Sequence, residues 1–146
     1  MSHVMRLILH WTQPRFTAGV VGVVLNAQDE VLLVEHVFHP QDPWGLPGGW
    51  LGRGESPASA LMRELQEETG IRVTIVCPLL METGHYFRTH LDMAFLCHAE
   101  GDVAALSSEL LDYRWTGLDE VPPMLPFHEA AVRAAQAQRK TEVVVL

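Results

Sequence analysis

The chain has 146 residues, of which 48% are hydrophobic and 19% are charged, and these values fit one globular domain rather than a disordered chain. Its net charge of −8 argues against a broad surface for extended nucleic acid, which would need clustered lysine and arginine. No apolar run is long enough to span a membrane, and residues 1–11 lack the apolar core and cleavage site of a secretory signal. We therefore expect a single domain over residues 1–146 in the cytoplasm, where Cys77 and Cys97 would stay reduced.

The first predicted elements are two strands joined by a turn. Phe16–Leu25 is rich in valine and predicts a buried strand, and Val31–Phe38 predicts the strand that returns beside it. Asn26 to Asp29 supply the turn residues between them. Residues 39–47 contain three prolines and a tryptophan and predict a loop or a broken edge strand.

A glycine-rich bend and a helix come next. Gly48, Gly49, Gly52 and Gly54 mark a backbone that bends sharply or approaches another group closely. A helix should then begin after Ser56, which is a good N-cap followed by Pro57, and end at Gly70.

The rest of the chain predicts three strands and a second helix. The strands are expected at Ile71–Leu80, Leu91–Ala99 and Leu110–Thr116, with a hairpin turn near Thr83 and Gly84 and an alanine-rich helix at Phe127–Lys140. Residues 142–146 could pair at a sheet edge or hold a partner subunit. This order of elements predicts a mixed α/β domain with a strand-rich centre.

Three carboxylates share one side of the first predicted helix. Glu64, Glu67 and Glu68 lie at positions i, i+3 and i+4, within an arc of about 100°. The adjoining arc is apolar and should pack on the core. Like charges at this spacing repel one another, and a divalent cation would reverse the sign of that interaction. Carboxylate and carbonyl oxygens are the ligands that Mg²⁺ prefers.

Residues 49–71, GWLGRGESPASALMRELQEETGI, resemble the Nudix box, Gly-x5-Glu-x7-Arg-Glu-U-x-Glu-Glu-x-Gly-U, in which U is a bulky aliphatic residue. The chain matches every defined position: Gly49, Glu55, Arg63, Glu64, Leu65, Glu67, Glu68, Gly70 and Ile71. The resemblance implies a Nudix-type α/β/α sandwich with a mixed central sheet and a loop–helix–loop metal site. It also implies a hydrolase that cleaves a diphosphate linkage.

The resemblance implies roles for four positions around the metal. Glu67 and Glu68 match the principal Mg²⁺ ligands, and the carbonyl of Gly48 matches a backbone ligand. Glu64 matches either a further ligand or the general base that takes a proton from water. Mg²⁺ is the expected cofactor, and Mn²⁺ is an expected substitute.

Other positions of the box match supporting residues. Glu55 and Arg63 match a pair that holds the loop against the helix, with Glu55 also a candidate metal ligand. Gly49 and Gly70 match structural glycines of the site.

Many Nudix enzymes use one more acidic residue outside the box. Glu100 and Glu109 are the candidates for a further metal ligand here, with Asp112 as a third possibility. For each of them a solvated loop carboxylate is the alternative.

Several residues outside the box are candidates for substrate contact. They are Trp44, Arg53 and Tyr86, for which ordinary packing or surface exposure is the alternative. His36 and His39 have a spacing typical of metal ligands, but they lack an acidic or cysteine partner, which favours a structural or solvent-facing role over zinc.

The sequence predicts a small nucleotide as the partner, with no extended nucleic acid, no membrane and a possible homodimer. The leading substrate is a nucleoside diphosphate linked to another group, such as ADP-ribose or a nucleotide sugar. The alternatives are a (deoxy)nucleoside triphosphate pyrophosphohydrolase that cleans the nucleotide pool, and a non-catalytic nucleotide-binding regulator.

Overall fold

The computed structural model describes residues 1–84 and 88–145, with side chains through Glu142. Its elements in chain order are α1 (His3–Thr12), β1 (Thr17–Leu25), β2 (Glu30–His36), β3 (Trp44–Gly45), β4 (Gly48–Trp50), α2 (Pro57–Thr69), β5 (Val73–Thr83), β6 (His90–Ala99), β7 (Leu110–Gly117) and α3 (Pro126–Val145).

The strands form one mixed sheet in the order β3-β2-β1-β6-β5, with β4 paired to β1 and β7 paired to β2. The β1 and β6 strands are parallel, and the other pairs are antiparallel. Strand β1 is therefore central, and the valines that predicted a buried strand lie in the middle of the molecule.

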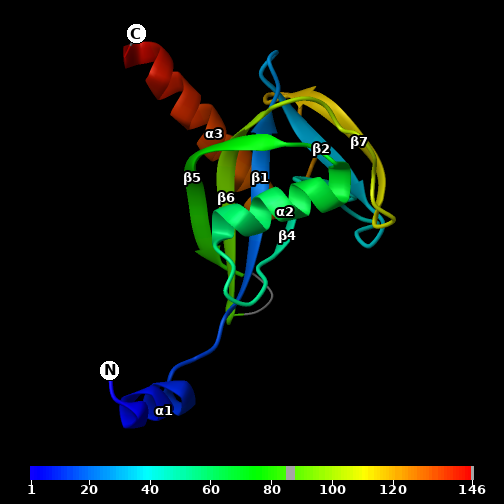
Figure 1. The fold of residues 1–146 in the computed structure, drawn as a ribbon. Helices are drawn as coiled ribbons and strands as arrows, with labels where there is room; N and C mark the ends of the chain where they lie inside the picture. Colours follow the sequence, from blue (N-terminus) through cyan, green and yellow to red (C-terminus); the bar gives the residue numbers. More distant parts are fainter. Residues whose placement is uncertain (85–87, 146) are drawn as a thin grey trace.

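Helices α2 and α3 lie on opposite faces of the sheet (Figure 1). Because successive strand residues point to opposite faces, β1 contributes to two separate cores. Val20 and Val24 share a cluster with Leu61 of α2. Val23 shares the other cluster with Ala135 of α3. This arrangement confirms the expected α/β/α sandwich with a mixed central sheet.

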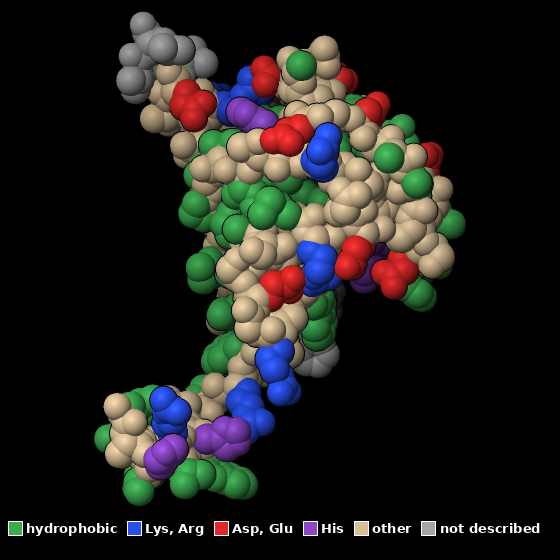
Figure 2. All heavy atoms as spheres, in the orientation of Figure 1, with side chains coloured by type: hydrophobic (Ala, Val, Ile, Leu, Met, Phe, Trp, Pro, Cys, Tyr) green, Lys and Arg blue, Asp and Glu red, His purple; other side chains and the backbone are tan. Residues whose placement is uncertain are grey.

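Helix α1 lies apart from the sandwich at the end of an extended segment (Figure 1). None of its residues is buried, and Ile8 and Trp11 are 51% and 82% exposed. Figure 2 shows its hydrophobic side chains at the surface beside basic ones. No helix was expected here from the sequence. No helix in the described part of the chain is long and apolar enough to cross a membrane.

The structure decides two points that the sequence left open. Residues 39–47 contain a short edge strand, because Trp44 and Gly45 form β3 against β2, and Gly48–Trp50 form β4 directly after this segment. Residues 142–145 do not pair at a sheet edge, because α3 continues to Val145. Both outcomes depend on contacts or continuity that short sequence windows do not reveal.

Candidate active site

The glycine bend lies directly beneath α2 because its backbone is paired to β1. Gly48 is opposite Val21 and Gly49 is opposite Val20 in this antiparallel pair. A Cβ on Gly48 would lie 2.0 Å from the carbonyl oxygen of Val20. A Cβ on Gly49 would lie 2.2 Å from Cδ of Glu64. Only glycine therefore allows the strand to approach both β1 and the Glu64 carboxylate.

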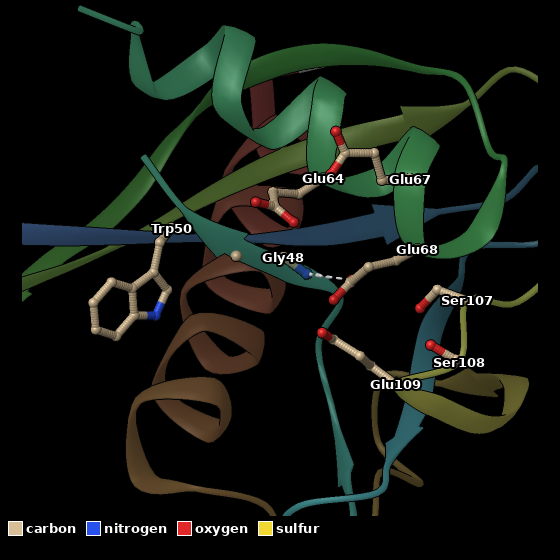
Figure 3. Close-up of a pocket in the computed structure, with 9 residues that line it drawn as sticks. Gly48, Trp50, Glu64, Glu67, Glu68, Ser107, Ser108 and Glu109 are labelled. Carbon is tan, nitrogen blue, oxygen red and sulfur yellow. Dashed lines mark hydrogen bonds between the residues drawn. The ribbon is translucent and has the colours of Figure 1, made fainter. Parts of the chain in front are cut away.

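This approach creates a pocket of about 460 Å³ between α2, β4 and the segment before β7. Four glutamates line it (Figure 3), three from α2 and one from the segment before β7: Glu64, Glu67, Glu68 and Glu109. We call this the carboxylate pocket. Ser107 and Ser108 complete its wall, together with Gly48, Gly49 and Trp50.

Glu68 is the most buried acid of the carboxylate pocket, with 8% of its surface exposed. Its Oε2 accepts a hydrogen bond of 3.1 Å from the backbone N–H of Gly48 (Figure 3). Burial raises the pKa of Glu68 to about 7. The hydrogen bond from Gly48 lowers this pKa, whereas repulsion from the neighbouring carboxylates Glu64, Glu109 and Glu67 raises it further. A cation bound nearby would favour the charged form.

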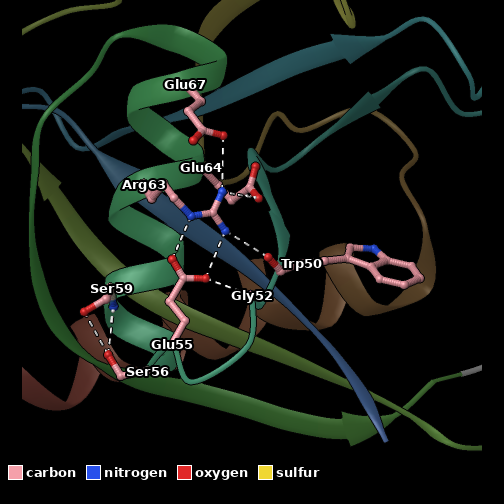
Figure 4. Close-up of polar contacts among 8 residues, drawn as sticks. All are labelled: Trp50, Gly52, Glu55, Ser56, Ser59, Arg63, Glu64 and Glu67. Atoms are coloured by element: carbon pink, nitrogen blue, oxygen red, sulfur yellow. Dashed lines mark hydrogen bonds and ion pairs between the residues drawn. The ribbon is translucent and has the colours of Figure 1, made fainter.

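Arg63 lies among the carboxylates and joins three of them (Figure 4). Its Nε donates to Glu55 at 2.7 Å, and its Nη1 donates to Glu64 at 2.9 Å and to Glu67 at 3.2 Å. Its Nη2 donates to the carbonyl of Trp50 at 3.1 Å, which ties α2 to the strand below it. The hydrogen bond from Arg63 lowers the pKa of Glu55 to about 2.

The carboxylate oxygens of the pocket are suitable ligands for a hard divalent cation, although they do not point to one common ion position. No three histidine, cysteine or acidic side chains of the described residues lie ready to hold one ion together. Glu64 and Glu67 are instead held by Arg63. The pocket nevertheless collects four carboxylates, one with a raised pKa. If a metal ion bound here, Glu64 and Glu67 would therefore have to give up their ion pairs with Arg63 in order to bind the ion.

Known proteins resemble the chain in sequence and fold. The NUDIX domain profile matches residues 15–137. A "MutT-like protein" of Streptomyces ambofaciens is 32% identical over 125 residues, covering 79% of this chain and 77% of that protein. The chain belongs to the Nudix family.

Two further proteins are similar to the chain, one in sequence and one in fold. An NAD-capped RNA hydrolase of Vibrio parahaemolyticus is 30% identical over 119 residues, covering 81% of this chain but only 44% of that protein. The chain therefore spans less than half the length of that relative. The crystal structure of an ADP-ribose pyrophosphatase from Streptococcus suis superimposes with a TM-score of 0.70 at 23% identity, covering 84% of this chain and 92% of that one. At this identity the match concerns the fold.

The structure brings some of the expected residues outside the Nudix box to the site and leaves others elsewhere. Glu109 lines the carboxylate pocket, whereas Glu100 lines none of the described pockets and accepts a hydrogen bond from Thr74. Asp112 accepts a hydrogen bond from the backbone of the next residue.

The three candidates for substrate contact also differ. Trp44 lines a second pocket beside the carboxylate pocket, with the guanidinium of Arg114 4.3 Å from its ring centroid. Arg53 is exposed in the loop between β4 and α2, away from the described pockets. Tyr86 lies outside the described residues.

The sequence did not reveal that histidines from distant segments meet in this second pocket. His36 and His39, expected to be structural or solvent-facing, line it with His90 and His128. Their sequence separation conceals this arrangement. The only local signal at His128 is its place after Pro126, where a helix begins.

Proposed function

We propose that the chain is a Mg²⁺-dependent hydrolase that cleaves the diphosphate linkage of a nucleoside diphosphate derivative, with ADP-ribose and nucleotide sugars as the leading substrates. The observation that carries this proposal is the set of four glutamates around one pocket beneath α2. Membership of the Nudix family supports the reaction type. The names of an NAD-capped RNA hydrolase and an ADP-ribose pyrophosphatase among similar proteins support a substrate with a diphosphate bridge.

In this proposal, Glu67 and Glu68 would hold Mg²⁺ together with the carbonyl of Gly48, and Mn²⁺ could substitute. Glu64 and Glu109 are the further ligands or the base, and Glu55 remains a candidate ligand. A cation held there would neutralise phosphate oxygens and lower the pKa of an attacking water.

The residues of the chain have separate tasks in the reaction. Glu68 must give up any proton that it carries near neutral pH before it can act as a ligand. Arg63 must release Glu64 and Glu67 while its hydrogen bonds to Glu55 keep it in place. The base, Glu64 or Glu109, accepts a proton from water as the water oxygen bonds to one phosphorus, and the bridging oxygen leaves with the other phosphate.

The experiment is a substrate panel with the purified chain and Mg²⁺, comparing ADP-ribose, nucleotide sugars, dinucleoside polyphosphates and (deoxy)nucleoside triphosphates. Product analysis identifies the bond that breaks. We expect nucleoside monophosphate and a phosphorylated second product from the first two substrates. Failure to hydrolyse any member of the panel, with tight nucleotide binding, would instead indicate a non-catalytic regulator.

A (deoxy)nucleoside triphosphate pyrophosphohydrolase is the second candidate, favoured by the similarity to a Bacillus subtilis protein named "Putative 8-oxo-dGTP diphosphatase", which is 29% identical over 107 residues. Release of pyrophosphate from a triphosphate at a higher kcat/KM than hydrolysis of ADP-ribose would support it.

The cytoplasmic location and the homodimer also remain predictions. The free state of Cys77 and Cys97 supports the first, and light scattering on the purified chain tests the second.

A further inference from the structure

A second pocket of about 310 Å³ adjoins the carboxylate pocket and shares part of its wall, including Gly48, Trp50 and Glu68. Four histidines line it, and they come from the end of β2, the segment after it, the start of β6 and the first turn of α3: His36, His39, His90 and His128. We call it the histidine pocket. A substrate whose diphosphate lies by the carboxylates has room to extend into it.

The imidazole of His128 is fixed in one orientation. Its Nδ1 accepts a hydrogen bond of 3.0 Å from the backbone N–H of Leu46. In the neutral ring the proton therefore lies on Nε2, which remains a donor. Burial lowers the pKa of His128 to about 4, with additional repulsion from His36 and His39. At neutral pH this side chain offers a hydrogen bond without a positive charge.

Trp50 and His90 form an aromatic part of the wall of the histidine pocket. Trp50 is 62% exposed, and its ring centroid lies 5.2 Å from that of His90. His90 is held by Thr17, at 2.6 Å from Nδ1, and by Asp92, at 3.2 Å from Nε2. A third cavity of about 280 Å³ continues beyond this wall toward Phe127. The face of a ring could therefore pack against the exposed side chain of Trp50.

The charge of this region points to a particular kind of ligand. Among the described residues, no lysine or arginine lines the histidine pocket, the carboxylate pocket or the third cavity. Their walls instead include carboxylates beyond those of α2, among them Asp42, Glu82 and Asp92. An additional phosphate placed here would meet carboxylates in the wall, and none of the described lining residues is a lysine or arginine that could contact it.

We propose that the histidine pocket binds an uncharged, hydroxyl-bearing ring joined to the diphosphate, and that its carboxylates select against a ring that carries another phosphate. This inference rests on the proposed function and narrows its substrate class. His128 donates to a hydroxyl, and the ring lies against Trp50. Asp42 excludes the extra phosphate by repulsion, so its removal and replacement by a cation should relax the selection.

The test compares ADP-ribose with its two derivatives that carry one phosphate on either ribose. Calorimetry without added metal measures binding, and kcat/KM with Mg²⁺ measures turnover. We expect at least one derivative to be worse than ADP-ribose by tenfold or more in both measurements. If both derivatives stay within threefold of ADP-ribose, the inference is overturned.

A charge reversal sharpens the test. Asp42→Lys should improve binding of the disfavoured derivative by at least fivefold relative to ADP-ribose, because it places a cation in the pocket wall. Asp119→Lys makes the same change at an exposed site away from these pockets and should leave the ratio unchanged. Equal effects of the two substitutions would show that overall charge, not the pocket, governs selection.

Trp50→Ala tests the aromatic wall. We expect KM for ADP-ribose to rise about fivefold while kcat changes little, because packing of the ring against Trp50 contributes to binding and not to bond cleavage. Trp11→Ala, at the exposed helix α1, is the matched control and should change neither constant. An unchanged KM in Trp50→Ala would contradict the assignment.

These measurements separate the two proposals. Selective binding without hydrolysis of any substrate would overturn the proposed function and support the pocket assignment. Hydrolysis without selection would overturn the pocket assignment alone. Neither binding nor hydrolysis of ADP-ribose would overturn both.

Discussion

Helices α1 and α2 begin with the same local signal but lie in opposite surroundings. In each, a serine N-cap accepts a hydrogen bond from the backbone N–H three residues later, Ser2 from Met5 at 3.3 Å and Ser56 from Ser59 at 3.2 Å. Helix α2 then packs on the sheet and presents its glutamates to a pocket, whereas α1 has no buried residue. A capping signal is therefore enough to start a helix, but packing decides whether that helix contributes to stability and chemistry.

The largest expected effect is on kcat, and it distinguishes a charged residue of α2 from a charged residue of α1. Glu67→Gln should lower kcat by about 10²- to 10⁴-fold, because the proposed metal loses a charged ligand while the shape of the side chain is kept. Steady-state kinetics with Mg²⁺ measures the change. Arg6→Gln, on α1, is the control and should alter kcat less than twofold. Near-normal turnover by Glu67→Gln would contradict the proposed catalytic role of α2.

Apolar residues should show the same contrast in stability. Leu65→Ala removes a fully buried side chain of α2 and should lower the free energy of unfolding by about 2–5 kcal/mol. Ile8→Ala removes a side chain that is 51% exposed and should change it by less than about 0.5 kcal/mol. Urea unfolding followed by circular dichroism measures both values. A large loss in Ile8→Ala would reveal that a partner or a second copy covers α1.

Stability should depend on pH through Glu68, which has no counterpart on α1. Its pKa is raised to about 7 from 4.5, so the folded state binds this proton more tightly than the unfolded chain. Its contribution to stability is thus fully present below pH 4.5 and lost as the pH rises through 7. We therefore compare the free energy of unfolding of Glu68→Gln with that of the unsubstituted protein in the absence of metal. From pH 4.5 to pH 8 the difference should shift in favour of the variant by up to about 3 kcal/mol.

Unfolding of both proteins in parallel at pH 5 and pH 8 measures this gain, because contributions from histidines then cancel. Saturating Mg²⁺ at pH 8 should reduce the difference by stabilising the carboxylate. A difference that is the same at both pH values would contradict the raised pKa.

The smallest expected effect concerns the two caps. Ser56→Ala should cost about 1 kcal/mol in the free energy of unfolding, because α2 unfolds together with the core. Ser2→Ala should leave that free energy unchanged and only reduce the helical signal of α1, since no packed residue depends on it. Equal costs in the two variants would show that α1 belongs to the cooperative unit.

The sequence predicted those features whose signals are local. Ser56 and Gly70 bound α2 as expected, with Gly70 in the left-handed conformation at φ 69°. The valine-rich segment forms β1, and the spacing of the glutamates places three of them around one pocket. Each of these depends on residues within about two helical turns of one another.

Features that depend on distant contacts could not be predicted. Strand β4 exists because Gly48 and Gly49 pair with β1, about 28 residues earlier in the chain. The histidine pocket brings His36 close to His128, from the opposite end of the domain. Arg63 was expected to hold the loop through Glu55 but also contacts Glu64 and Glu67. The i,i+4 spacing of Arg63 and Glu67 allows the second pair, whereas the contact with Glu64 depends on how the two side chains pack.

The position of His128 has a consequence for how such enzymes could diverge. The carboxylates come mainly from α2, whereas the first turn of α3 contributes to the histidine pocket and belongs to a segment that begins after β7. A single recombination crossover after Gly117 would exchange that part of the pocket between relatives and leave the glutamates untouched. Chimaeras joined at this point should inherit the reaction from one parent and part of the ligand preference from the other.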